Sequence, residues 1–169
     1  MPVSRRLVLG ALLAAGCPRA EPEPPKWRSW AAYLPRDVAG QVPFEPEAMD
    51  GQVVLVTFIA TWCFPCLAEF AVLSRLDRDF AARGFRNVLV GMDLDGHKTL
   101  DPFARGYELA WPLVVADERL LSGDSLFGRV RELPSRLLFG RDGKLVLGYS
   151  GVAAYEDLAK AVAAAIDAR

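Results

Sequence analysis

Apolar and polar residues along the chain form two kinds of pattern. Short apolar runs without turn residues predict strands, and apolar residues three or four apart predict helices. The predicted strands are residues 42–44, 53–59, 87–92, 136–139 and 145–149, with an extended segment at 109–115. The predicted helices are residues 67–83, 100–108 and 155–166, and residues 118–130 are expected to form a helix or a broken helix interrupted at Gly123 and Gly128. This order predicts an α/β fold, a central mixed β-sheet with helices on both faces. Pro43 argues against a central position for its strand, and Pro112 favours an edge or a loop.

The strand at 53–59 leads directly into the sequence Trp62-Cys63-Phe64-Pro65-Cys66. Two cysteines three residues apart at the start of a helix can close a small disulfide with little backbone movement. The free N–H groups and the dipole of the helix stabilise a thiolate, so we expect the pKa of Cys63 to fall below the ~8.5 of free cysteine. Cys66, one turn inside the helix, should be more shielded. An attacking sulfur and a resolving sulfur are what exchange through a mixed disulfide requires.

Half a zinc site is the alternative interpretation of this cysteine pair. Protein zinc sites use three or four protein ligands. Outside the pair the chain offers only Cys17, near the N-terminus, and one histidine, His97. The composition therefore disfavours zinc, and we expect no bound metal.

The stretch Trp62-Cys63-Phe64-Pro65-Cys66 after a hydrophobic strand resembles the active site of the thioredoxin superfamily. Glu69, three residues after the second cysteine, makes it similar to the TlpA/ResA-like membrane-tethered thiol:disulfide oxidoreductases. The similarity extends from about residue 38 to the C-terminus. It implies a thioredoxin-like fold with an insertion after the second core strand. It also implies a protein-disulfide reductase that needs no cofactor beyond a redox-active Cys63–Cys66 disulfide.

The resemblance implies roles for further residues. Many thioredoxins carry a buried aspartate six residues before the first cysteine, where this chain has Thr57, so that base is absent. Glu69 is implied as the proton acceptor and donor for Cys66. The alternative is a surface glutamate that interacts with the helix dipole.

The resemblance also implies a substrate-docking region. Pro134 precedes the strand at 136–139, where these folds place a cis-proline facing the disulfide; a trans proline at a strand start is the alternative. The residues assigned to substrate binding are Trp62, Phe64, Pro65, Leu133 and Pro134.

The N-terminal residues predict export. Residues 1–16 combine basic residues with a ten-residue apolar stretch, too short to span a membrane, as in a signal peptide. The sequence ending in Cys17 resembles a bacterial lipobox, which implies lipid on Cys17 and accounts for the odd number of cysteines. The alternatives are an ordinary signal peptide or an uncleaved anchor, and Arg5-Arg6 also resembles a twin-arginine signal.

The predicted domain organisation follows from this N-terminus. Residues 17–37 form a proline-rich tether and residues 38–169 the thioredoxin-like domain. Trp27, Trp30 and Tyr33, spaced by three, are expected to pack on the domain as a short helix.

These observations predict a redox protein on the periplasmic side of the bacterial cell envelope, anchored to the membrane by lipid. The expected partners are client proteins with cysteine pairs and, by resemblance, a membrane electron donor of the DsbD/CcdA-like kind. The formal net charge of −1 gives no reason to expect nucleic-acid binding. The alternatives are a copper chaperone using Cys63, Cys66 and His97, and a thiol peroxidase. The chain lacks the Pro-x-x-x-Thr-x-x-Cys setting of peroxiredoxins.

Overall fold

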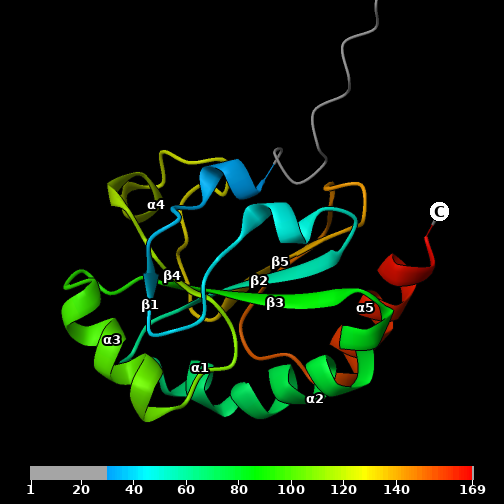
Figure 1. Cartoon of the computed structure of the whole chain (residues 1–169), viewed down its shortest axis with the longest axis horizontal. Coiled ribbons are helices and arrows are strands. Elements are labelled where there is room, and N and C mark those ends of the chain that lie inside the picture. The colour runs from blue at the N-terminus through cyan, green and yellow to red at the C-terminus, as the bar shows by residue number, and fades with distance from the viewer. Residues whose placement is uncertain (1–29, 169) are drawn as a thin grey trace, which may run out of the picture.

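A computed structural model of the protein describes residues 30–168. Its centre is a six-stranded sheet with the order β1-β4-β3-β2-β5-β6 (Figure 1). The strands are β1 (Val38–Ala39), β2 (Val53–Ile59), β3 (Phe85–Gly91), β4 (Leu113–Val115), β5 (Ser135–Phe139) and β6 (Leu145–Ser150). The β2–β3 and β3–β4 pairs are parallel, and the other three pairs are antiparallel. The predicted mixed sheet is confirmed.

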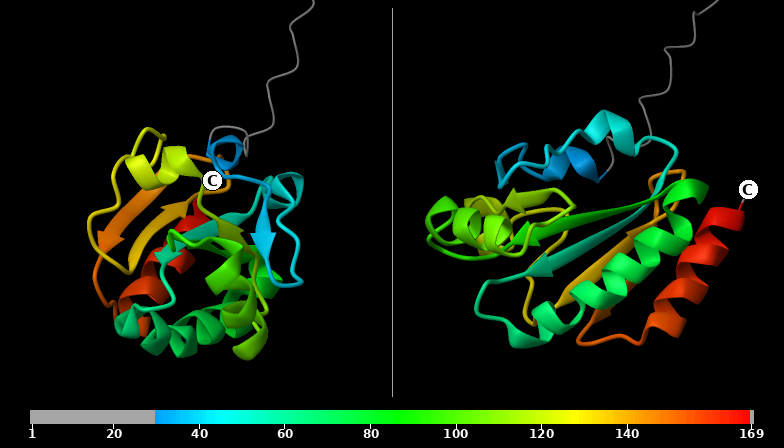
Figure 2. Two further views of the ribbon diagram at one scale, coloured as in Figure 1. Left: turned by 90° about the vertical axis from the view of Figure 1, so that its left-hand side faces the viewer. Right: turned by 60° about the horizontal axis from the view of Figure 1, so that its bottom comes forward.

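Helices cover both faces of this sheet. They are α1 (Phe64–Ala68), α2 (Phe70–Phe80), α3 (His97–Gly106), α4 (Glu118–Ser122) and α5 (Tyr155–Asp167). α2 and α5 lie side by side across one face, with α1 and α3 on the same side (Figure 2). The N-terminal segment and α4 cover the other face. The predicted arrangement of helices on both faces is therefore confirmed.

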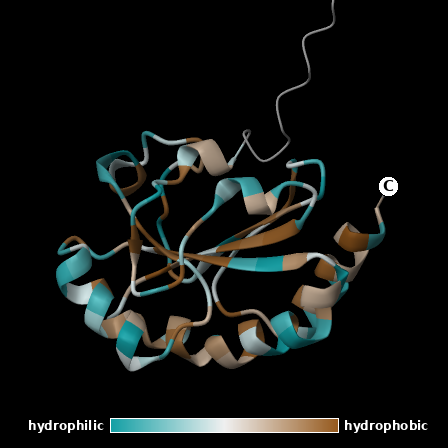
Figure 3. Ribbon diagram, in the orientation of Figure 1, coloured by the Kyte–Doolittle hydropathy of each residue, from teal (hydrophilic) through white to brown (hydrophobic). Residues whose placement is uncertain are grey.

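The residues of β2 separate two hydrophobic cores. Leu55 and Ile59 face α2 and α5, whereas Val54 and Phe58 face the N-terminal segment and α4. Side chains alternate between the faces of a strand, so a strand covered on both sides must be apolar throughout. The strands at the centre are largely apolar, and polar residues gather on the surrounding helices (Figure 3). This arrangement explains why the boundaries of β2 match the prediction.

The helix predicted at 67–83 is divided in the structure. It begins at Phe64, because Cys63 caps it and Pro65 fits its first turn. It is interrupted at Glu69, whose N–H bonds three residues back to the Cys66 carbonyl oxygen, and α2 ends at Phe80. The prediction of one continuous helix is therefore wrong, and the helical turn starts directly after the first cysteine.

Three other predicted elements need correction. Residues 42–44 form no strand, and the short β1 lies earlier in the chain. β4 is not an edge strand, because Val38 of β1 pairs with Val114 on its outer side. Of the two forms predicted for residues 118–130, the continuous helix is wrong and the interruption at Gly123 is confirmed: α4 ends at Ser122, and Gly123 adopts a left-handed conformation with φ of 89°. The segment between β3 and β4 contains α3, in line with the expected insertion.

The packed domain starts earlier than residue 38. Trp30, Ala31 and Leu34 are buried, and the ring of Trp30 stacks on Phe139 with centroids 4.9 Å apart. The predicted packing of this aromatic segment is confirmed for Trp30, within a turn of 3-10 helix at Ala31–Tyr33. The predictions for the signal peptide, Cys17 and Trp27 lie outside the described residues. None of the helices within residues 30–168 combines the length and apolar character needed to cross a bilayer.

Candidate active site

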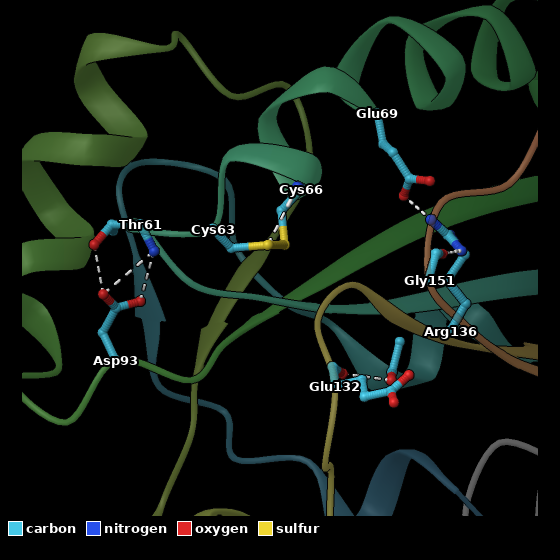
Figure 4. The surroundings of a disulfide bond; sticks show 9 residues. Thr61, Cys63, Cys66, Glu69, Asp93, Glu132, Arg136 and Gly151 are labelled. Atoms are coloured by element: carbon cyan, nitrogen blue, oxygen red, sulfur yellow. Dashed lines mark hydrogen bonds and ion pairs between the residues drawn. A yellow bond between two sulfur atoms is a disulfide. The ribbon is translucent and has the colours of Figure 1, made fainter.

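The cysteine pair lies where β2 gives way to α1 (Figure 4). Cys63 and Cys66 are joined in a disulfide, and the Sγ atom of Cys63 accepts a hydrogen bond of 3.2 Å from the backbone N–H of Cys66. Cys63 is therefore the N-cap of α1, where unpaired N–H groups of the helix point toward the sulfur. Both cysteines are buried, with 4% and 1% of their surfaces exposed, so the predicted difference in shielding is small in this oxidised form.

Large apolar side chains are exposed next to the buried disulfide. Trp62 is 70% exposed and Phe64 is 82% exposed. Leu94, which the sequence analysis did not assign to the site, is 88% exposed on the loop after β3. Exposed aromatic and aliphatic side chains beside a reactive group are suited to contact with another protein.

Asp93 holds this loop against the segment before the cysteines. Its buried carboxylate accepts a hydrogen bond from the backbone N–H of Thr61 at 3.0 Å and a second from the Thr61 hydroxyl (Figure 4). Sequence patterns gave Asp93 no role in the site. Parallel pairing puts the ends of β2 and β3 side by side, with Ile59 opposite Gly91, and an acid directly after β3 was the available signal.

Glu69 is buried, with 2% of its surface exposed, so the alternative of a surface glutamate is wrong. One carboxylate oxygen accepts a hydrogen bond of 2.9 Å from the backbone N–H of Ala153, and the other forms an ion pair with Arg136. Figure 4 shows the carboxylate directed toward Arg136 rather than toward the sulfur atoms. The role of Glu69 in moving protons for Cys66 stays a prediction.

Arg136 lies on β5, opposite Thr57 of β2 and Tyr149 of β6. It is 2% exposed, and its Nη1 donates a hydrogen bond of 2.7 Å to the carbonyl oxygen of Gly151. Burial lowers the pKa of Arg136 to about 10, so the guanidinium stays positive at neutral pH, where it pairs with the Glu69 carboxylate. The sequence analysis gave Arg136 no role, although an arginine within a buried strand needs an anionic partner.

Pro134 lies at the same end of the sheet as the disulfide. It precedes Ser135 of β5, which pairs with Phe58 near the end of β2. The Leu133–Pro134 peptide bond is cis, so the trans alternative is wrong. The carbonyl oxygen of Pro134 accepts a hydrogen bond of 2.8 Å from Gly151, which joins this turn to the segment before α5.

His97 is the first residue of α3, and its side chain is exposed. Its Nε2 atom lies 2.9 Å from a carboxylate oxygen of Asp37, and its Nδ1 atom lies 3.2 Å from one of Asp101. Hydrogen bonding, to Asp37 first and Asp101 second, raises the pKa of His97. Both ring nitrogens thus have carboxylate partners. Among residues 30–168, no group of three or more His, Cys, Asp and Glu side chains is placed to hold a metal ion.

Comparison with known proteins gives a family and a fold. Residues 34–147 match the model of the AhpC/TSA family. The chain is 24% identical over 119 residues to thiol-disulfide oxidoreductase ResA of Halalkalibacterium halodurans, covering 70% of this chain and 65% of that protein. It is 27% identical over 108 residues to ResA of Bacillus subtilis, covering 63% and 58% of the two chains. The matches therefore span about three fifths of these relatives.

A solved structure shows the same fold. Thiol:disulfide interchange protein DsbE from Chlorobium tepidum superimposes with a TM-score of 0.64 at 24% identity, covering 76% of this chain and 91% of that chain. The predicted thioredoxin-like fold is confirmed. The recognised similarity to TlpA/ResA-like proteins is confirmed by the ResA relatives.

Proposed function

Because the chain belongs to the AhpC/TSA family and carries a disulfide at the start of α1, we propose that it is a thiol:disulfide oxidoreductase that reduces disulfides in client proteins. The observation that carries the proposal is the Cys63–Cys66 disulfide, with Cys63 capping the helix and Pro134 at the same end of the sheet. Two relatives named thiol-disulfide oxidoreductase ResA support the same activity.

The proposed reaction is a two-step exchange. The Cys63 thiolate attacks one sulfur of the client disulfide, a mixed disulfide forms, and the other client sulfur leaves as a thiolate. Cys66 then loses its proton, with Glu69 as the proposed acceptor, and its sulfur attacks Cys63. The client leaves with two reduced sulfurs and the Cys63–Cys66 disulfide is restored. Two electrons have passed from the protein to the client, and an external donor must return them.

Exposed residues give this reaction a docking surface. Trp62, Phe64 and Pro65 are exposed beside the disulfide, while the half-buried Leu133 and the buried Pro134 complete the contact region proposed for the client chain. Clients with a cysteine pair, such as apocytochrome c or copper-site proteins, fit this reaction. Phe64 carries no charge and Pro65 no N–H, so neither favours the thiolate, which agrees with a reducing protein.

The proposed location is the periplasmic side of the cell envelope. The signal-like residues 1–16 and the lipobox-like sequence at Cys17 support export and lipid attachment. A donor of the DsbD/CcdA-like kind in the membrane would then keep the cysteine pair reduced. Outside the cytoplasm a reducing pair depends on such a dedicated supply of electrons.

Insulin reduction tests the proposed activity directly. With dithiothreitol as electron source, the wild-type protein should accelerate insulin precipitation, and Cys63→Ser should abolish the acceleration. Cys66→Ser should accumulate mixed disulfides with clients in the native envelope, because the resolving sulfur is missing. A folded wild-type protein whose disulfide cycles with dithiothreitol but leaves insulin and every envelope protein untouched would refute the proposal.

Assays of peroxide consumption and of Cu(I) binding distinguish the two alternative functions from the proposed one. Rapid peroxide consumption by the reduced protein would favour a thiol peroxidase. Tight Cu(I) binding that His97→Ala abolishes, in a protein without exchange activity, would favour a copper chaperone. Under the proposed function His97→Ala leaves insulin reduction unchanged, since His97 pairs with Asp37 and Asp101.

A further inference from the structure

A buried ion pair lies behind the redox site. Glu69 and Arg136 are each 2% exposed, and the pair joins the junction of α1 and α2 to β5. Burying two charges costs more free energy than burying apolar side chains of similar size, so such a pair is weak evidence for a purely stabilising role. The ion pair lies close to the redox site in sequence, because Glu69 follows Cys66 by three residues and Arg136 follows Pro134 by two.

The pair also holds the segment that leads into α5. Glu69 accepts a hydrogen bond from the N–H of Ala153, and Arg136 donates one to the carbonyl oxygen of Gly151. The N–H of Gly151 in turn bonds to the carbonyl oxygen of Pro134. The helix with the cysteines, the turn at Pro134 and this segment therefore meet at one pair of charges (Figure 4).

Among residues 30–168, the charged and titratable groups around Glu69 come from β5, β6 and the helices α1, α2 and α5. From β5 comes Arg136, with the ring of Tyr149 on β6 lying 5.8 Å from its Cζ atom. From α1 come Cys63 and Cys66. The charged and titratable groups of α2 and α5 nearby contact one another: Arg75 lies close to Asp79, Tyr155 and Glu156.

We propose that Arg136 is a positioning residue for the redox pair: it keeps the Glu69 carboxylate ionised, in the form that can accept a proton, and so sets the pH range in which Cys66 gives up its proton. This inference rests on the proposed function. It concerns how the resolving sulfur is activated rather than which client is reduced.

The direction of the effect follows from the charge of Arg136. A nearby cation favours the ionised form of both a carboxyl group and a thiol. Residues three apart on a helix are neighbours, so Cys66 senses the charge of Glu69, and the two groups titrate as a coupled set. With the guanidinium removed, both groups should retain their protons to higher pH. A single neighbouring charge typically moves such a titration by about 1 to 3 pH units.

The test follows the reduced protein as it reacts with the chromogenic disulfide 5,5′-dithiobis(2-nitrobenzoate). A first release of chromophore reports attack by Cys63, and a second reports resolution by Cys66. Rates of the second phase are measured against pH for the wild type, Arg136→Met, Arg136→Lys, Glu69→Gln and the double variant E69Q/R136M. Arg131→Met is the matched control, because Arg131 is exposed and lies close to Pro134 in sequence.

The expected pattern distinguishes positioning from structure. Arg136→Met should move the second-phase profile up by about 1 to 3 pH units, whereas Arg136→Lys and Arg131→Met should leave it near the wild type. Glu69→Gln removes the proposed proton acceptor and should slow the second phase, while the loss of its negative charge should move the profile down, and E69Q/R136M should move the profile back toward the wild type. A structural role alone would lower the unfolding midpoint of the Arg136 variants without moving the profile.

Superimposed profiles of the wild type and a folded Arg136→Met would overturn the inference. Should Arg136→Met fail to fold, the comparison of Glu69→Gln with E69Q/R136M decides, because Glu69→Gln keeps Arg136 hydrogen-bonded to Gly151 and the double variant buries neither charge; coincident profiles there would overturn the inference too. No protein client enters this assay. The inference can therefore fail while insulin reduction persists, and insulin reduction can fail while the profile shifts.

Discussion

Asp93→Ala should release the segment that carries Trp62 and Cys63 from the end of β3. The change removes two hydrogen bonds from Thr61 to a buried carboxylate. Hydrogen bonds to charged groups contribute about 1.5–3 kcal/mol each to stability. Thr61 is only partly buried, so water can replace part of the loss. We therefore expect the free energy of unfolding to fall by about 2–3 kcal/mol for the two bonds together.

Chemical denaturation of the oxidised protein at pH 7 measures this change. Asp95→Ala is the matched control, because Asp95 is exposed on the same loop, and it should change the free energy by less than about 0.5 kcal/mol. Thr61→Val removes only the hydroxyl contact and should cost less than Asp93→Ala. Combined with Asp93→Ala, it should add little, since the two residues share the bond. Equal unfolding free energies for the Asp93 and Asp95 variants would show that the two hydrogen bonds do not stabilise the loop.

Three further results should follow. Hydrogen bonds to Asp37 and Asp101 raise the pKa of His97 above its ordinary 6.5. The stabilisation that these bonds give is present below pH 6.5 and is lost as the pH rises through the raised pKa, so the stability of the wild type should decline over that range. A His97→Gln variant whose stability declines equally over the same range would contradict this. Leu76→Ala should cost about 2–5 kcal/mol because Leu76 is fully buried, whereas Leu94→Ala, 88% exposed, should cost almost nothing; similar unfolding midpoints would disprove the packing. Phe64→Ser should raise the KM for insulin while leaving the reaction with small disulfides unchanged, and an unchanged KM would remove Phe64 from the docking surface.

Features encoded by neighbouring residues could be predicted from the sequence. β2 is apolar throughout because helices cover both of its faces, so its two ends were predicted correctly. The cysteines and the position of Pro134 were also visible as local patterns. Each of these signals depends on residues close together in the chain.

Features that depend on distant partners were missed. Val38–Ala39 forms a strand only because β4 offers an edge, and an isolated two-residue pattern gives no signal. The break between α1 and α2 falls at Glu69, which is held by Arg136 and Ala153 from the far end of the chain. The hydrogen bonds between Asp93 and Thr61 likewise join two loops 32 residues apart. Helical periodicity carries no information about such contacts.

The stacking of Trp30 on Phe139 has a consequence for orientation. Phe139 pairs with Val54 near the start of β2, while Cys63 follows the end of that strand. At about 3.3 Å per residue, the five steps from Val54 to Ile59 separate these regions by roughly 16 Å, and Trp30 packs on the opposite face of the sheet from the cysteines. If a lipid is attached upstream of Trp30, as proposed, its chain would join the domain on the face of the sheet opposite the sulfur atoms and would leave them uncovered.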